Sequence, residues 1–332
     1  MHTPVRPPKI RDVAKCAGVS VATVSRYFSN PEILSDRSRA AVEQAVAETG
    51  YTLNVMGRNF RQAQVGAVLA LVPNLANPFF SQILAGMSEV LRQAGLNLLV
   101  LDTRQVERDA PTQGLRSYLT RSQSDGIIVL DGSLAPELFS APDCPPVVQA
   151  CEWIDGVPGS RVMADNAEGA RLAVQHLLDL GHRKILHLAG PAANTLSISR
   201  AEGVASALST RGLEPVAVIE GAFTLGSGRE AAAAVRDAAP TAVFCDNDEM
   251  AIGLMSGLAE LGLSVPEDIS LVGFDNIEMA AYARVPLTTV RQRRAVIGQE
   301  AARLLLAQRD GAAGQTRVLP VELCPRGSTR RM

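Results

Sequence analysis

Aromatic and polar side chains follow apolar, strand-length runs of this 332-residue chain, where they suit the recognition of a small ring-shaped ligand. Phe79 and Phe80 follow the first such run, and aromatic faces stack on a sugar or base ring. Arg200 and Asp275 follow later runs, and their charged groups offer paired donors and acceptors to neighbouring hydroxyls. This combination predicts a binding site for a polar ring. Two further positions of the same kind are Phe223 and Asn247.

Apolar runs of strand length alternate with amphipathic segments of helix length, and these elements must position the candidate side chains. The alternation predicts parallel sheets with helices on both faces, and ligands of such sheets bind beyond the carboxyl ends of the strands. Because the alternation runs twice, we expect two similar doubly wound α/β subdomains with a cleft between them. The expected strands are 65–72, 96–101, 126–130, 146–150, 184–189, 215–220, 241–245, 269–274, 287–292 and 317–324. The expected helices are 79–94, 108–122, 167–180, 198–211, 226–238, 248–261 and 294–308.

Residues 9–30 have a different pattern, that of a helix–turn–helix unit. A first helix runs into Gly18, which tolerates the positive φ of a tight turn. Ser20 can cap the second helix, which can lie in a DNA major groove with its N-terminal residues at the base edges. A third helix over 36–49 is expected between Ser35 as its cap and Gly50 as its end.

Charge is distributed unevenly along the chain, although the net charge is only −2. The first 62 residues hold nine Lys and Arg against five Asp and Glu, so this part is basic and the remainder is acidic. A basic head suits phosphate contact at one end only. No apolar run is long enough to cross a bilayer and no signal core is evident, so a cytoplasmic protein is expected. The cysteines are scattered along the chain and are expected to be small buried apolar residues. Neither they nor the histidines have the spacing of metal ligands, so neither a metal nor a cofactor is expected.

The string IRDVAKCAGVSVATVSR (10–26) resembles the DNA-binding headpiece of the LacI/GalR family of bacterial repressors. The resemblance continues through VMGRN (55–59), LVPNLANPFFSQI (71–83), TAVFC (241–245), GFDNI (273–277), PLTTV (286–290) and RGSTR (326–330). It implies a helical headpiece joined to a body like that of the periplasmic sugar-binding proteins. It also implies a ligand-responsive repressor that binds a pseudo-palindromic operator as a homodimer. The chain ends at RGSTRRM without a heptad extension, so a tetramer is not expected.

The same resemblance implies the domain boundaries. The headpiece covers 8–52, a hinge covers 53–63, and the effector-binding body covers 64–330. The first subdomain comprises about 64–164 and 290–320, and the second about 165–289 and 321–330. In the hinge, Asn54 is a candidate DNA contact, and Phe60 stands where the family usually has a leucine that wedges into the central base step. Gly57 weakens a hinge helix by about 1 kcal/mol relative to Ala, and a plain linker is the alternative.

The resemblance also assigns the DNA-reading residues of the second helix. Val21 and Ala22 occupy base-discriminating positions, where they can offer only apolar contact, for example to a thymine methyl. Arg26 occupies a third such position and can form two hydrogen bonds to a guanine. The remaining candidate DNA contacts are Ser20 at the start of the helix and Thr23, Ser25 and Asn30 at phosphates.

In the body, Phe79, Phe80, Arg200 and Asp275 match the family's effector contacts, and the nucleoside- and purine-responsive members are the most similar. This implies a nucleoside, nucleobase or pentose effector. Asn194 stands where the purine-responsive member has an arginine, and Leu196 is closer to the nucleoside type. The residues leave open whether the effector releases or tightens DNA binding. The weaker candidate contacts are Asn194, Leu196, Phe223 and Asn247.

A solute-binding protein and an enzyme are the two alternatives to a DNA-binding repressor. A solute-binding protein of a transporter would share the body but would need a secretion signal and no helix–turn–helix. An enzyme would need a catalytic constellation, yet no Ser/His/Asp or paired-carboxylate arrangement is evident, and the glycines at 226–228 do not form a nucleotide-binding loop. Simpler interpretations remain for Asp102 and Asp131 as turn residues, Asp248 as a helix cap, and Trp153 as a cleft wall or core residue.

Overall fold

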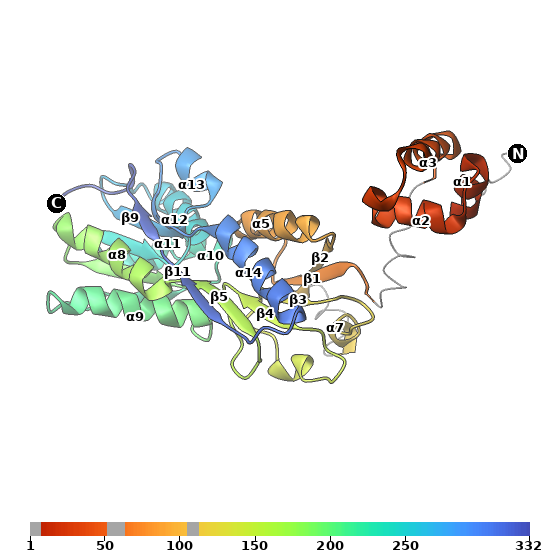
Figure 1. The fold of residues 1–332 in the computed structure, drawn as a ribbon. Helices are drawn as coiled ribbons and strands as arrows, with labels where there is room; N and C mark the ends of the chain where they lie inside the picture. The colour runs from red at the N-terminus through yellow and green to blue at the C-terminus, as the bar shows by residue number, and fades with distance from the viewer. Residues whose placement is uncertain (1–7, 52–63, 105–112) are drawn as a thin grey trace, which may run out of the picture. The chain divides into compact units, whose positions relative to one another are not determined.

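The computed structural model describes residues 8–51, 64–104 and 113–332. These residues form two compact units, Met1–Gln64 and Val65–Met332, which are described separately below (Figure 1). The predicted DNA contacts Asn54 and Phe60 lie outside the described residues.

The first unit, called the headpiece below, is a small bundle of helices. The Ser20 hydroxyl caps the second helix by accepting a hydrogen bond from the Thr23 amide at 3.1 Å, as predicted. Gly18 (φ 64°) ends the first helix, and Gly50 (φ 63°) ends the third, both in the left-handed region that glycine tolerates. The helices are α1 (Ile10–Ala17), α2 (Val21–Ser29), the 3-10 turn η1 (Pro31–Ile33) and α3 (Asp36–Thr49). Their common core is built from Val13, Ala14, Val24, Val42 and Ala45.

The second unit, called the body, contains two six-stranded sheets. The first sheet is parallel, with the order β11 (Thr316–Leu319), β5 (Ser160–Ala164), β4 (Val147–Ala150), β3 (Ile127–Val129), β1 (Ala67–Val72) and β2 (Asn97–Asp102). The second has the order β12 (Glu322–Cys324), β10 (Thr288–Arg291), β9 (Ser270–Asp275), β8 (Ala242–Cys245), β6 (Ile185–Ala189) and β7 (Val218–Glu220). Only β12 runs antiparallel to its neighbour. The doubly wound architecture is the one that the sequence predicts.

Helices cover both faces of the sheets (Figure 1). In the first subdomain α5 (Phe79–Gln93) packs closely on α14 (Arg294–Arg309), because two glycines lie at their crossing. A Cβ atom on Gly298 would lie 2.0 Å from the Ile83 carbonyl oxygen, and one on Gly86 would lie 2.1 Å from that of Ala295. The other helices are α7 (Gln113–Arg116), α8 (Asn166–Asp179), α9 (Thr195–Ser209), α10 (Leu225–Glu230), α11 (Ala232–Ala238), α12 (Asp248–Glu260) and α13 (Glu278–Tyr282), with the 3-10 turn η2 (Pro136–Phe139).

The chain passes between the two subdomains three times: from β5 to α8, from β10 to α14, and from β11 to β12. The third crossing lies beside the other two. The Asp165 amide donates to the Leu319 carbonyl at 3.0 Å, and Arg291 is paired in register with Glu322. Because β10 belongs to the second sheet up to Arg291, the expected boundary at residue 290 falls two residues inside that strand.

Several expected elements differ from the structure. The expected strand 317–324 is two strands in different sheets, because Pro320 has no amide hydrogen to continue the first ladder. In the described part of 108–122 the structure has only the short helix α7, and the helix expected over 226–238 is divided at Ala231 into α10 and α11. The strand β5 and the helix α13 were not predicted. Cys16, expected to be buried, is exposed and donates a hydrogen bond to Glu48.

Candidate functional site

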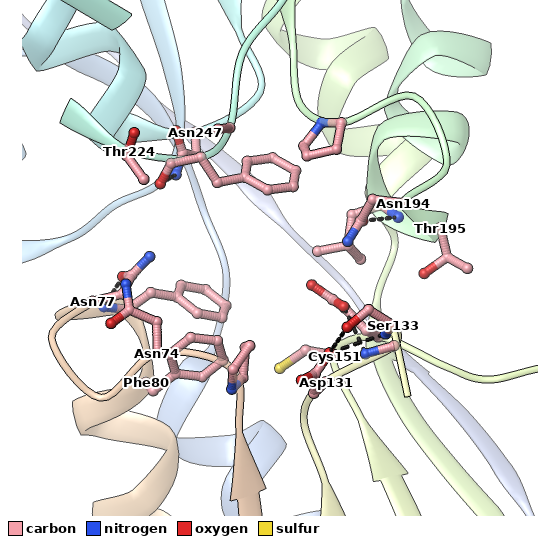
Figure 2. A pocket seen from close by; sticks show the side chains of 18 of the residues that line it. Asn74, Asn77, Phe80, Asp131, Ser133, Cys151, Asn194, Thr195, Thr224 and Asn247 are labelled. Atoms are coloured by element: carbon pink, nitrogen blue, oxygen red, sulfur yellow. Dashed lines mark hydrogen bonds between the residues drawn. The ribbon is translucent and has the colours of Figure 1, made fainter. Parts of the chain in front are cut away.

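A cavity of about 560 Å³ lies between the two subdomains, at the carboxyl ends of their strands (Figure 2). We call it the cleft. Polar side chains surround its space from both subdomains, with Asn74, Asp131 and Ser133 from the first and Thr224 and Asn247 from the second. Every effector contact predicted from the sequence is among its lining residues: Phe79, Phe80, Asn194, Leu196, Arg200, Phe223, Asn247 and Asp275.

Aromatic rings line the cleft from two directions. Phe79 and Phe80 begin α5 and meet edge to face, with ring centroids 5.1 Å apart. The Asn77 side chain fixes this turn by accepting a hydrogen bond from the Phe79 amide at 2.8 Å. Phe223 lies on the side of the second subdomain and has a positive φ of 56°, which is rare for a large side chain. The cleft therefore offers aromatic faces to a flat or ring-shaped ligand.

Arg200 lies almost fully buried at the base of the cleft, with 1% of its surface exposed. Its Nε and Nη2 atoms donate to Asn166 Oδ1 at 3.0 and 2.9 Å, and Nη1 donates to the Asp246 carbonyl. Its guanidinium carbon lies 3.9 Å from the centroid of the Phe274 ring. Its donors are thus largely used by residues of its own subdomain, so Arg200 stabilises the second subdomain's wall of the cleft besides facing the cleft.

Asp275 lies 3.9 Å from Arg200 Nη2 and accepts a hydrogen bond from Gln292 Nε2 at 2.7 Å. Burial raises the pKa of its carboxyl group to about 6, although Arg200, Arg294 and Gln292 each act to lower it. Its φ of 110° places the residue in a backbone region that side chains rarely adopt. Gln292 donates to the Oδ1 atom of this buried carboxylate. A ligand that donates further hydrogen bonds to the carboxylate would stabilise its charged form.

Two acidic residues of the cleft were not predicted as contacts. Asp131, which the sequence suggested as a turn residue, accepts hydrogen bonds from the Ser133 amide and hydroxyl and from the Thr103 hydroxyl. Glu152 follows β4, and one of its oxygens accepts from the Gly132 amide at 2.8 Å. Burial raises the pKa of Glu152, while hydrogen bonds from Gly132 and Asn194 lower it. Asn194 belongs to the second subdomain, and both residues line the cleft.

Some candidates have structural roles that the sequence left open. Asn247, not Asp248, caps α12, with its Oδ1 atom accepting from the Met250 amide at 2.9 Å. Asp248 is buried and bonded to Thr289 and to the Ile277 amide. Asn194 caps α9 by accepting from the Leu196 amide. The turn role suggested for Asp102 agrees with its bonds to the Leu75 and Arg104 amides, and the half-buried Trp153 is not among the cleft-lining residues.

The headpiece presents the N-terminal turn of α2 to its surface. Val21 has 42% of its surface exposed, and Ala22 and Arg26 are also exposed. The Val21 side chain is therefore accessible to another molecule. The remaining predicted contacts are Ser20 and Asn30, which are exposed, and Thr23 and Ser25, which are half-buried.

Within the described ranges, no group of three or more His, Cys, Asp or Glu side chains is arranged to hold a metal ion. Over the same residues, the helices are all too short or too polar to span a membrane.

Comparison with known proteins decides the family. Residues 9–54 match the family model "Bacterial regulatory proteins, lacI family", and residues 174–329 match "Periplasmic binding protein-like domain". The HTH-type transcriptional repressor CytR of Escherichia coli (strain K12) is 37% identical over 97% of this chain and 96% of that repressor. The chain belongs to the LacI family. It is therefore a DNA-binding transcriptional regulator with an effector-binding body, and its relatives are repressors rather than enzymes.

Other LacI-family proteins support the same assignment. The repressor PurR of Vibrio atlanticus (strain LGP32) is 33% identical, with 90% of each chain covered. The Lac repressor dimer bound to operator and the anti-inducer ONPF has a TM-score of 0.85 at 31% identity, over 98% of this chain and all of that one. A LacI-family regulator from Enterococcus faecium with bound ribose has a TM-score of 0.73 at 31% identity, over 80% of this chain and 99% of that one.

Proposed function

We propose that this LacI-family chain is a repressor that binds a pseudo-palindromic operator as a homodimer in the cytoplasm. A nucleoside, nucleobase or pentose in the cleft switches it. Ligand binding changes the populations of the cleft states and so changes the affinity for DNA. The similarity to CytR and PurR and to a ribose-bound regulator supports this class of ligand.

The observation that carries the proposal is the composition of the cleft wall. The rings of Phe79, Phe80 and Phe223 suit the apolar faces of a base or a sugar. The carboxylates of Asp131 and Asp275 lie in the same cavity and suit the donor groups of neighbouring hydroxyls. A ring that carries vicinal hydroxyls satisfies both requirements. The volume of about 560 Å³ lies in the usual range for a small-molecule site.

Thermal-shift measurements with cytidine, adenosine, adenine, ribose and glucose test the ligand class. A ligand that binds the folded state raises the melting temperature with its concentration. We expect a nucleoside, a base or ribose to do so, and the Phe80→Ala variant to lose the shift because it removes a ring from the wall. A Phe139→Ala variant is the control, because Phe139 is buried in a core outside the cleft. A shift with glucose and with no other compound would overturn the proposed class.

The affinity for the cleft ligand is expected to fall as the pH decreases below about 6. Hydroxyl donors of the ligand bind the ionised Asp275 carboxylate, whose pKa burial raises to about 6. Ionised Asp275 is the main form above this pH and is lost below it, so the dissociation constant rises about tenfold per pH unit below 6 and is level at pH 7–8. Calorimetric titration at several pH values measures this profile.

The matched variant for the pH profile is Asp275→Asn, which keeps the shape of the side chain and removes its titration. We expect weaker binding that no longer depends on pH in this range. Glu152 also has a pKa raised by burial and lines the same cavity. An unchanged pH slope in Asp275→Asn would assign the titration to Glu152 and contradict the role of Asp275.

The Arg26→Ala variant is expected to weaken operator binding by about 1–3 kcal/mol, with the loss concentrated at one base pair of each half-site. Arg26 is exposed on α2, and a guanidinium there can form two hydrogen bonds to guanine. Binding measured on operators with single base-pair changes at constant salt shows the position. An equal loss on every operator would assign Arg26 to a phosphate instead.

A further inference from the structure

A second cavity, of about 610 Å³, lies between α9 and β7 in the second subdomain. We call it the α9–β7 groove. Its lining includes His187 and Ala189 of β6, Ser197 and Ala201 of α9, and Val218 of β7. Because β7 is the last strand of its sheet, the groove lies at an edge where no further strand covers it.

Large apolar side chains are exposed at this groove. Ile198 on α9 has 50% of its surface exposed, and Val218 on β7 has 61%. Both line the groove, together with the exposed Ala201. Such side chains form a hydrophobic wall that a flat apolar group can cover.

The groove also contains a polar atom that lacks a partner. Ser197 has only 4% of its surface exposed, and its hydroxyl oxygen is buried without a hydrogen-bond partner among the described residues. A Cβ atom on the neighbouring Gly190 would lie 2.6 Å from this oxygen and 2.1 Å from Cζ of Phe223, so the hydroxyl lies beside Gly190 and the Phe223 ring. Buried hydroxyls nearly always have partners, and a bound polar atom would supply one here.

The charged groups of the groove are mainly acidic. Glu202 and Glu220 are exposed carboxylates in its lining, which includes no Lys or Arg. Glu220 Oε1 accepts from the Ala192 amide at 3.2 Å, and its second oxygen has no bond among the described residues. His187 is engaged with Asp246 at 2.7 Å. The two carboxylates therefore favour a cation at the opening.

We propose that the α9–β7 groove is a second small-molecule site that binds an arylalkylamine with a polar group on its ring. The ring lies against Ile198, Ala201 and Val218. Its polar group bonds the Ser197 hydroxyl, and the ammonium group meets Glu202 and Glu220. These three contacts require an apolar centre with one polar end and one cationic end, and an arylalkylamine with a ring hydroxyl has this form.

The groove is separate from the cleft. Asn194, Thr195 and Leu196 at the start of α9 line the cleft, whereas Ser197 and Ile198 line the groove. The two cavities thus lie on adjacent faces of α9, with Leu196 and Arg200 at the cleft and Ser197 and Ala201 at the groove. Binding in the groove can be measured whether or not the cleft binds a nucleoside. A negative result for the groove therefore leaves the proposed cleft ligand untouched, and a negative result for the cleft leaves the groove untouched.

Methyl NMR of the full-length protein with labelled Ile and Ala methyl groups tests the site, with tyramine as the probe. Tyramine has a ring, a phenolic hydroxyl and an ammonium group. We expect its addition to shift the Ile198 and Ala201 signals in a saturable manner. Phenethylamine, which lacks the hydroxyl, and 3-(4-hydroxyphenyl)propionate, which carries a carboxylate in place of the amine, are each expected to bind about tenfold more weakly.

The Ala201→Phe variant places a ring in the groove and is expected to abolish the shifts. Ser206→Phe, on the exposed part of α9 outside the groove lining, is the matched control that keeps them. The methyl spectrum without probe shows that each variant is folded. Shifts that do not saturate, equal binding by Ala201→Phe, or equal binding of the carboxylate analogue would each overturn the proposal.

Discussion

The Arg200→Met variant is expected to lower the free energy of unfolding of the body by about 3–5 kcal/mol. Methionine fills much of the same volume but donates no hydrogen bonds. It leaves Asn166 Oδ1 and the Asp246 carbonyl without their donor, and it removes the guanidinium group that lies 3.9 Å from the Asp275 carboxylate. Urea unfolding followed by the fluorescence of Trp153, the single tryptophan of the chain, measures the body alone.

Arg211→Met is the matched control for this variant. Arg211 forms a long ion pair of 3.8 Å with Asp179, and both side chains are largely exposed. Surface pairs of this kind contribute little, so a change within about 0.5 kcal/mol is expected. A loss below about 1 kcal/mol in Arg200→Met would contradict the structural role of the buried cation and leave it as a ligand contact alone.

The Gly298→Ala variant is expected to destabilise the body by about 1–3 kcal/mol, although alanine is the better helix former. The new Cβ atom would lie 2.0 Å from the Ile83 carbonyl oxygen and 3.0 Å from the Met87 nitrogen. Both are backbone atoms of α5, so α5 and α14 would have to move apart. Urea unfolding with the same tryptophan signal measures the loss.

The control for the helix crossing is Gly226→Ala in α10. There the nearest atom to a new Cβ would be Thr224 Oγ1 at 3.9 Å, an ordinary contact distance. The substitution is expected to be neutral or to stabilise by up to about 1 kcal/mol. A stabilisation of similar size in Gly298→Ala would show that the two helices are free to separate.

The architecture could be predicted because most strands are short, continuous apolar runs between helix patterns. The runs 65–72 and 184–189, for example, became β1 and β6 with small changes at their ends. The strand β5 was missed because buried and half-buried residues alternate along it, so it has no continuous apolar run. Which sheet each strand joins depends on contacts distant in sequence, and β11 and β12 diverge after a single proline.

The cleft could be located from the sequence because residues after parallel strands gather at one edge of a sheet. The rule predicted that these side chains lie close together, and one cavity is lined by Phe79, Phe80, Arg200 and Asp275. The same rule does not distinguish acidic side chains that face a ligand from acidic side chains that only stabilise a turn. Asp102 ends β2 and Asp131 follows β3, and both bond to nearby amides, yet only Asp131 of the two lines the cleft. That difference depends on how adjacent strand ends are oriented in the folded chain.

The three crossings between the subdomains restrict how the body can move. The bond between Asp165 and Leu319 links the first and third crossings at the first sheet, and the pairing of Arg291 with Glu322 links the second and third crossings at the second sheet. Three linked segments that lie side by side resist twisting more than bending. They favour a motion that changes the angle between the two halves of the cleft. A ligand that contacts both halves acts on that angle.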